Sequence, residues 1–380
     1  MTIPSLAAAT YIDAERDLNQ LVDSLRAERR IACDTESNSL HAYRGRTCLI
    51  QLSTPDRDVL IDPLRIADIS ALGLVFADPG IEKIFHAAEY DLICLKRDYD
   101  FDVRPVFDTM AAARVCGYTR IGLGNMLEEL LGVRHSKKHQ TADWAQRPLP
   151  PSHRQYAQMD THYLLPLRDI LYGELQRAGR LEEVFEYFAD VTAFEVKPQE
   201  FDPEGFWALC RPKDLNPRQA AVLRELYILR DELAQHYDQP SHMLIANKAL
   251  LKLATTSPRG PRQLFGVSGL PPWLVRQNGG EISQAISHGN KSLAPPQPPH
   301  RVTIPQAIAD RYSALHTWRK GVALSRGVES DVILSKGSMW AIARRKPASV
   351  DDLDCIPGLG PWRRATYGAD LVSVVNGQGR

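Results

Sequence analysis

The chain has 380 residues, of which 44% are hydrophobic and 24% are charged, and its formal net charge is +0. These values match soluble globular proteins, so they exclude a single small module, wholesale disorder, a collagen-like repeat and a disulfide-dense scaffold. The length leaves room for two or three domains. The cysteines form no C-x-x-C pair, and neither a basic leader nor a long apolar run indicates secretion or a membrane span. We therefore expect a cytoplasmic protein with reduced thiols that is not inserted in a membrane.

The neutral total conceals two halves of opposite charge. Residues 1–200 contain 31 acidic and 23 basic side chains, whereas residues 201–380 contain 15 acidic and 23 basic ones. The net charges of the halves are therefore −8 and +8. A basic half can hold a polyanion such as a nucleic acid while an acidic half acts on it with metal ions. Solvated surface charge that drifts between domains would give the same totals, so charge alone leaves both interpretations open.

The first half mixes short β-like runs with helical stretches. Short apolar runs separated by turn residues predict three consecutive strands that form a meander: 31–36, 48–53 and 59–62. A helix around 69–76 is followed by a further predicted strand, 83–87, and by a helix over 89–97. This alternation is typical of mixed α/β domains. The pattern over 152–177 predicts one long helix with a kink at Pro166.

The second half has almost no β pattern and is predicted to be all α. The proline-rich stretch 291–305 cannot hold a helix and predicts a semi-stiff linker between two helical blocks. The two blocks repeat, because a shift of 89 residues aligns many identical residues without a gap. Examples are Leu226 with Leu315, Arg230 with Arg319, Gly269 with Gly358 and Trp273 with Trp362. We predict two copies of one small helical bundle.

Three acidic motifs in the first half are candidates for catalysis. Asp34 and Glu36 end the first predicted strand, where alternation puts both carboxylates on one face. At 4 Å two such charges repel by about 1 kcal/mol in water and about 4 kcal/mol near a protein surface, so they need a counter-ion or a proton. Asp91 stands near the start of a helix, and Tyr156 and Asp160 lie one helical turn apart. Singly, each motif also fits solvated acids, a residue that complements the helix dipole, or an incidental polar position.

Together the five residues resemble the DEDDy branch of the DEDD exonucleases, which have a ribonuclease-H-like fold. The segments 47–53 and 142–149 resemble the ribonuclease D family, and the repeated blocks resemble HRDC domains, which are named for helicases and ribonuclease D. The resemblance covers nearly the whole chain. It implies an α/β ribonuclease-H-like exonuclease domain over 1–200, followed by two all-α HRDC-like bundles over 205–290 and 306–380.

The turn of the HRDC family differs between the two blocks. The second block has Ile-Pro-Gly-Leu-Gly over 356–360, which matches the family pattern, whereas the first has Val-Ser-Gly-Leu-Pro over 267–271. We therefore expect the two blocks to bind nucleic acid unequally.

The resemblance implies a 3′→5′ exoribonuclease that releases nucleoside 5′-monophosphates from RNA, with transfer-RNA precursors as substrates and a monomeric state. In the family, residues at the positions of Asp34, Glu36, Asp91 and Asp160 bind two magnesium or manganese ions, and Tyr156 would orient the attacking water. A ligand set made only of oxygens favours these hard cations over zinc. Two other functions stay open: a DNA 3′→5′ exonuclease of the same superfamily, and a catalytically inert RNA-binding adaptor.

Eight basic residues are candidate contacts to RNA phosphates, with an ordinary solvated surface as the alternative. They are Lys137, Lys138, Arg147, Arg319, Arg344, Arg345, Arg363 and Arg364. His135 and His139 have a spacing that suits a metal site on a helix. The basic, loop-like residues between them argue against that role.

Overall fold

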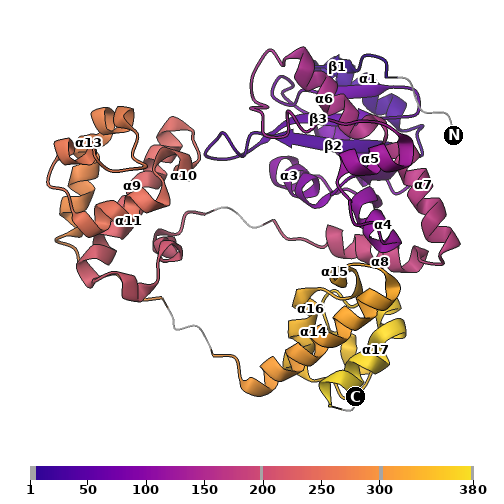
Figure 1. The fold of residues 1–380 in the computed structure, drawn as a ribbon. Helices are drawn as coiled ribbons and strands as arrows, with labels where there is room; N and C mark the ends of the chain where they lie inside the picture. Colours follow the sequence, from indigo (N-terminus) through magenta and orange to yellow (C-terminus); the bar gives the residue numbers. More distant parts are fainter. Residues whose placement is uncertain (1–5, 197–199, 299–302, 378–380) are drawn as a thin grey trace. The chain divides into compact units, whose positions relative to one another are not determined.

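The computed structural model describes residues 6–196, 200–298 and 303–377 (Figure 1). The chain forms two compact units. The first unit comprises Met1–Ser37, Thr47–Val196 and Thr303–Arg380, and the second comprises Asn38–Arg46 and Lys197–Val302. The two predicted helical bundles therefore belong to different units, and the second bundle shares its unit with the α/β domain.

A six-stranded mixed sheet forms the centre of the first unit. Its strands are β1 (Thr10–Ile12), β2 (Arg30–Ser37), β3 (Thr47–Ser53), β4 (Asp58–Ile61), β5 (Glu82–Phe85) and β6 (Val106–Asp108). The order across the sheet is β1-β4-β3-β2-β5-β6. Strand β3 is antiparallel to both β2 and β4, and the other neighbouring pairs are parallel. The predicted meander and the predicted α/β fold are thus confirmed.

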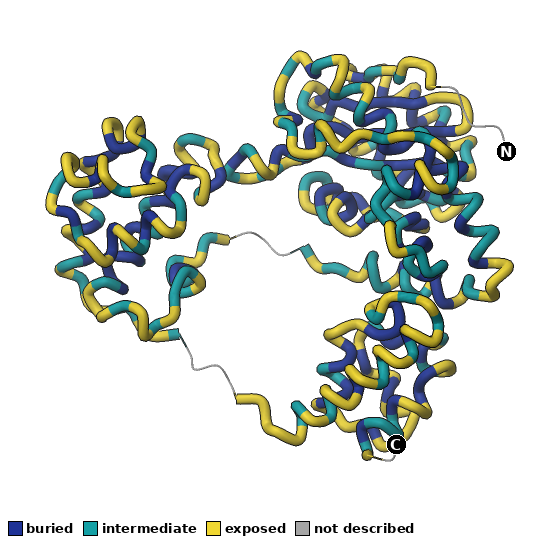
Figure 2. The backbone as a smooth tube through the Cα atoms, viewed as in Figure 1, coloured by how far each residue is buried: buried dark blue, intermediate teal, exposed yellow. Residues whose placement is uncertain are grey.

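Eight helices cover the two faces of this sheet. They are α1 (Glu15–Leu25), α2 (Ser70–Ala77), α3 (Glu89–Tyr99), α4 (Thr109–Cys116), α5 (Leu123–Leu131), α6 (Pro151–His162), α7 (Leu164–Arg177) and α8 (Leu181–Thr192). Alternation along β2 sorts its side chains. Ile31 and Cys33 pack in a core with α1, α2 and α3, whereas Ala32 packs in a second core with α4, α5, α7 and α8. Strands β3 and β4 are buried along their whole length, and Figure 2 shows buried stretches running through this domain.

Residues 152–177 form two helices and not one. Helix α6 ends at His162, and Tyr163 between the helices has φ −100° and ψ 3°, outside the helical range. Pro166 lies in the first turn of α7, where the missing N–H of proline removes no helical hydrogen bond. The prediction of a single helix kinked at Pro166 is therefore wrong.

The second unit contains the first copy of the helical repeat, which we define as α9–α13. Two short 3-10 turns, Pro203–Leu209 and Pro212–Asp214, lead into α9 (Pro217–Tyr237), α10 (Ser241–Leu244), α11 (Asn247–Thr256), α12 (Pro261–Leu264) and α13 (Pro272–Gly289). The loop that follows β2 also belongs to this unit. The Tyr43 hydroxyl donates a hydrogen bond to Asp231 of α9 at 2.9 Å, and the Tyr43 N–H donates to Asp238 at 3.1 Å.

The second copy, α14–α17, lies in the first unit. Its helices are α14 (Gln306–Arg326), α15 (Ser330–Ile333), α16 (Lys336–Arg345) and α17 (Pro361–Val375), with a 3-10 turn at Asp351–Leu353. Helices α14, α15, α16 and α17 each begin 89 residues after α9, α10, α11 and α13, which confirms the predicted repeat. Of the predicted linker, 299–302 lies outside the described residues, and the rest forms no helix or strand.

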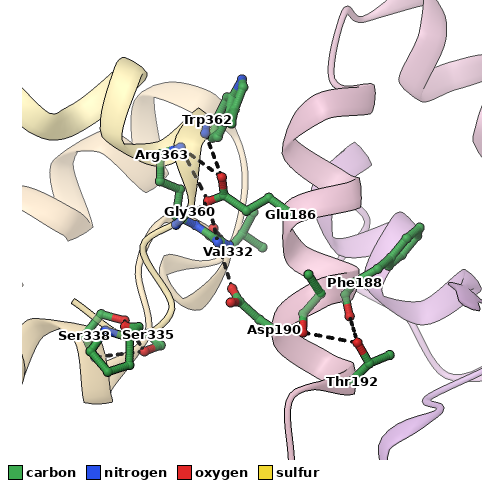
Figure 3. Close-up of polar contacts among 12 residues, drawn as sticks. Glu186, Phe188, Asp190, Thr192, Val332, Ser335, Ser338, Gly360, Trp362 and Arg363 are labelled. Carbon is green, nitrogen blue, oxygen red and sulfur yellow. Dashed lines mark hydrogen bonds and ion pairs between the residues drawn. The ribbon is translucent and has the colours of Figure 1, made fainter. Parts of the chain in front are cut away.

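The second copy packs against α8 of the α/β domain (Figure 3). Val332 is completely buried in the same core as residues of α4, α7 and α8. Glu186 and Asp190 of α8 point toward Arg363 at the start of α17. Across the described parts of both units, none of the helices combines the length and the apolar character that crossing a bilayer requires.

Candidate active site

Alternation along β2 brings the first two acids to the side of the sheet that α6 covers. Asp34 and Glu36 have the same parity as Ala32, and α6 packs across β2, β3 and β4 on that side. Asp160 of α6 therefore meets them from above the sheet. One carboxylate oxygen of each of the three residues lies within 4.8 Å of the others. The structure thus joins the first and third predicted motifs in one carboxylate group.

A cleft of about 310 Å³ opens over this carboxylate group. Tyr156, one turn before Asp160 on α6, contributes to its lining, and Lys137 does so from the loop after α5. The other lining residues are Asp34, Thr35, Glu36, His86, Ala87, Met110, Gly122, Leu123, Gly124, His135, Gln140 and Asp160. A phenol and a lysine ammonium therefore lie in the same cleft as the three carboxylates.

Asp91 approaches from the opposite face of the sheet. It lies in the first turn of α3 and is 6% exposed. Thr35, whose side chain alternates to the α3 side of β2, donates to Asp91 Oδ1 from its N–H at 2.9 Å and from its hydroxyl at 2.6 Å. Burial raises the pKa of Asp91 to about 7, against the lowering effect of these hydrogen bonds. The second motif thus stands beside the carboxylate group and is tied to the strand that carries it.

The electrostatics of the group call for a cation. Burial raises the pKa of Asp34 well above its usual range, and Asp91, Asp160 and Glu36 raise it further. The pKa of Glu36 is raised by burial and then by Asp160 and Asp91. No lysine or arginine within the described ranges forms an ion pair with Asp34, Glu36 or Asp160. Buried oxygens of this kind suit hard divalent cations, so the residues present fit magnesium or manganese.

Asp108, which the sequence did not single out, positions the start of α3. Its carboxylate accepts hydrogen bonds from the N–H groups of Ala87 at 3.0 Å and Ala88 at 2.9 Å. Ala87 has φ +66°, a conformation that costs free energy in a residue with a side chain and needs such support. The same carboxylate also caps α4. Asp108 therefore holds together the backbone that leads to Asp91.

His135 is a further residue of the site that the sequence did not place. Its Nε2 lies 3.1 Å from Asp160 Oδ1, and its side chain is 5% exposed. Burial raises the pKa of Asp160, whereas the hydrogen bond and the charge of His135 lower it. The segment is not helical, and the ring of His139 packs against His153 with centroids 4.4 Å apart. The contact between His135 and Asp160 joins a loop to helix α6, so no spacing in the sequence could reveal it.

The three predicted RNA contacts near the site differ in their surroundings. Lys137 lines the cleft, and Lys138 is exposed beside it. Arg147 is bound on every side: it donates to Asp62 at 2.6 and 2.8 Å, and to the Cys48 carbonyl at 2.7 Å. Asp62 is completely buried. Arg147 therefore fixes its loop to the ends of β3 and β4, and its contact to RNA stays a prediction.

The predicted RNA contacts of the second copy also divide. Arg319 donates to the Leu334 carbonyl at 2.8 Å, and its repeat equivalent Arg230 donates to the Ile245 carbonyl at 3.1 Å. Because both copies use this arginine in the same way, Arg319 is a structural residue of the bundle. Arg344 and Arg345 are exposed, and their contact to RNA stays a prediction.

Arg363 and Arg364 both have acidic partners. Arg363 is 2% exposed and forms ion pairs with Glu186 at 3.0 Å and Asp190 at 2.7 Å. Arg364 pairs with Asp354. In this arrangement the guanidinium of Arg363 makes an internal contact, and its contact to RNA stays a prediction.

Comparison with known proteins agrees with this description. A family model described as a 3′-5′ exonuclease matches residues 9–176, and the HRDC domain model matches 219–286 and 309–375. Fold and site thus define a 3′→5′ exonuclease with two HRDC domains. The Ribonuclease D of Gluconacetobacter diazotrophicus is 30% identical, over 97% of this chain and 93% of that protein. The chain belongs to the ribonuclease D family of 3′→5′ exoribonucleases.

The chain is also similar to part of a longer protein and to a solved structure. The Exosome complex component 10 homolog of Caenorhabditis elegans is 34% identical over 73% of this chain, which corresponds to 32% of that protein. The chain thus spans about a third of the length of that relative. The crystal structure of Escherichia coli RNase D covers 98% of this chain and all of its own, with a TM-score of 0.71 and 24% identity. This structural likeness establishes the shared fold.

Proposed function

We propose that the chain is a metal-dependent 3′→5′ exoribonuclease that hydrolyses RNA stepwise to nucleoside 5′-monophosphates. The observation that carries the proposal is the group of Asp34, Glu36 and Asp160, three carboxylates that have no lysine or arginine partner among the described residues and lie in a cleft that also holds Tyr156. These three would hold one divalent ion. Asp34 would also contact a second ion, which Asp91 would support from the α3 side.

The residues of the cleft have separable roles in the proposed reaction. Bound ions would stabilise the negative charge that develops on the attacking and leaving oxygens of an in-line hydrolysis. Burial, followed by Asp160 and Glu36, raises the pKa of Tyr156, so the phenol keeps its proton and orients the attacking water by a hydrogen bond. Lys137 would contact a phosphate of the substrate, and His135 would fix the orientation of Asp160.

The substrate and setting are proposed from the family. We infer that RNAs with a free 3′-hydroxyl, transfer-RNA precursors among them, are degraded or trimmed by a monomer in the cytoplasm. The carboxylates contact phosphate oxygens through metal ions and do not read the 2′ position, so the ribonuclease D relatives support the preference for RNA. Matched RNA and DNA oligonucleotides of one sequence test this preference, and faster cleavage of DNA would favour the alternative exonuclease.

Asp160→Asn tests the site directly. This change removes an ion ligand and should abolish release of nucleotides from a 5′-labelled RNA, while binding of the RNA is kept. Tyr156→Phe should reduce the rate by about 10²-fold, the usual effect of one lost positioning hydrogen bond. Asp17→Asn, at an exposed position of α1, is the matched control and should behave like the parent. Parental cleavage by Asp160→Asn would refute the assignment, and a parent that shifts RNA in a gel without shortening it would indicate the inert adaptor.

A further inference from the structure

The last long helix of the repeat is α13 in the first copy and α17 in the second, and the two helices differ in what lies at their first residues. In the second copy, α8 packs against the start of α17. Glu186 accepts hydrogen bonds from the N–H groups of Gly360 at 3.1 Å and Trp362 at 2.7 Å, at the start of α17 (Figure 3). The carboxylate thus occupies the positive end of the helix dipole, and Arg363 pairs with the same group. The helix terminus of the second copy is therefore already bound to an anion from its own chain.

The turn that matches the HRDC family is used for this internal contact. A Cβ atom on residue 360 would overlap the carboxyl group of Glu186, so only glycine allows the approach. The first copy has Pro271 at the equivalent position, which lacks an N–H, and Leu274 in place of Arg363. The family turn therefore does not mark the copy whose surface is free for RNA.

The first copy instead has a strongly basic exposed surface. Residues 239–280 contain five basic side chains and no acidic one, whereas the equivalent stretch of the second copy, 328–369, contains six basic and five acidic ones. We define the five as the first-copy basic surface: Lys248, Lys252, Arg259, Arg262 and Arg276. All five are exposed, and none takes part in an ion pair with another residue that the structure describes. Their charge is therefore available to an external polyanion.

The first-copy basic surface follows neighbouring elements of the bundle. Lys248 and Lys252 lie one turn apart on α11. The turn before α13 packs on the same helix, because a Cβ on Gly269 would lie 3.1 Å from the Ala246 side chain and 3.5 Å from Lys248 Cε. Helix α13 then begins at Pro272, next to the exposed Trp273, and no side chain caps it. Lys248, the turn and the uncapped helix terminus therefore lie together.

Two aromatic rings accompany these charges. Phe265 is 49% exposed in the segment between α12 and α13, and Trp273 is 37% exposed while its ring packs edge-on against Tyr237 at 5.1 Å. Basic residues interleaved with exposed aromatic rings suit single-stranded nucleic acid, since the phosphates meet the charges and the bases stack on the rings.

We infer that the first copy binds single-stranded RNA through the first-copy basic surface, whereas the second copy is a docking element held by α8. This inference rests on the proposed function, because it supposes that the chain acts on RNA. It differs from the sequence-based candidates for RNA contacts in the helical blocks, all of which lie in the second copy.

A pair of charge-reversal variants tests this division. The first changes Lys248, Lys252 and Arg262 to Glu, and the second changes Lys320, Arg344 and Arg345 to Glu, three exposed positions of the second copy. Affinity for a 20-nucleotide single-stranded RNA is measured in full-length protein with a chelator present, at several salt concentrations. The first variant should bind about 10-fold more weakly or worse, with a salt slope reduced by about 2, because each lost contact to a single strand contributes about 0.7. The second should stay within about 2-fold of the parent.

The results that overturn the inference are distinct from those that overturn the proposed function. Equal losses in both variants, a loss only in the second, or parental affinity in the first would each refute the assignment to the first copy. Parental affinity is also the result expected if this surface binds a protein. Thermal unfolding checks that each variant folds, and Lys248→Gln, Lys252→Gln and Arg262→Gln replace the first set if charge reversal unfolds it. Whether the parent shortens RNA is measured separately, so a failed exonuclease would not be mistaken for a failed binding surface.

Discussion

Two groups of acidic side chains in the first unit differ in their partners. Glu183, Glu186 and Asp190 of α8 are each paired with an arginine of the second copy, as in the contact of Arg326 with Glu183 at 2.8 Å. The carboxylate group of the cleft, comprising Asp34, Glu36 and Asp160, has no lysine or arginine partner among the residues described. Acids that are largely shielded from water are therefore common to a structural contact and to the candidate active site, and the missing lysine or arginine partner distinguishes the second.

The comparison has an energetic basis. A buried charge without a partner destabilises a fold by several kcal/mol, and arginine offsets this at the α8 contact. In the cleft the acids raise one another's pKa values, so only protons or bound cations can offset the repulsion. The repulsion in the cleft thus lowers the stability of the metal-free protein, and a bound divalent ion would offset it. Changes to metal, side chains and pH should therefore affect the two groups of acids differently.

Removal of divalent metal should affect only the cleft. A chelator should abolish RNA cleavage, and magnesium or manganese should restore it, because the carboxylate group has no lysine or arginine partner among the described residues. Zinc alone should restore little, since the ligands are all oxygens. Release of labelled nucleotide measures the effect. Rescue by zinc alone, or full activity in the chelator, would contradict the account of the cleft.

Arg363→Leu replaces the arginine of the α8 contact by leucine, the residue that the first copy has at the equivalent position, Leu274. It leaves Glu186 and Asp190 without their arginine and should lower the free energy of unfolding by about 3–5 kcal/mol. Arg364→Leu removes a more exposed pair with Asp354 and should cost about 0–1 kcal/mol. Urea unfolding of both variants gives the comparison. Similar small losses would show that the α8 contact does not depend on its buried arginine.

Gly360→Ala tests the close approach of Glu186 to α17. The added methyl group overlaps the Glu186 carboxyl and should destabilise the protein by about 1–3 kcal/mol, as overpacking does. Gly321→Ala on α14 is the control, since no atom lies within 4 Å of its added Cβ, and it should be neutral or slightly stabilising. The same urea measurement applies, and an unchanged stability in Gly360→Ala would argue against the tight contact.

The pH dependence of the metal-free protein should show the burial of Asp91 as a smaller effect. The pKa of Asp91 is raised to about 7, above the value of about 3.9 in an unfolded chain. The folded state then binds the proton more tightly, so stability is highest below pH 4 for this group and is lost as the pH rises toward 7. With a chelator, the melting temperature of Asp91→Asn should therefore fall less between pH 5 and 8 than that of the parent. Equal slopes would contradict the shift.

Much of the site follows from local rules. Alternation along β2 predicts that Asp34 and Glu36 share a face, and helical spacing predicts that Tyr156 and Asp160 reach a common point, as the structure finds. The register of the repeat likewise predicts the paired helices of the two copies. These features depend on residues close in the chain or on a constant offset, so the sequence contains them.

Other features depend on contacts that local patterns do not encode. Arg147 finds its carboxylate at Asp62, and Arg363 finds Glu186 on a different domain. Both look like exposed bases in the sequence, because only the tertiary structure shows which charges are already neutralised. The break at Tyr163 also escapes local patterns, since proline in a first helical turn resembles proline within a longer helix.

Calorimetric titration with manganese separates the two groups of acids without relying on cleavage. The parent should bind manganese, and Asp160→Asn should bind it more than about 10-fold more weakly, since an ion ligand is removed. Glu186→Gln, which changes an acid of the α8 contact, should bind manganese as the parent does. Parental affinity in Asp160→Asn, or a loss of binding in Glu186→Gln alone, would contradict the assignment of the metal ions to the cleft.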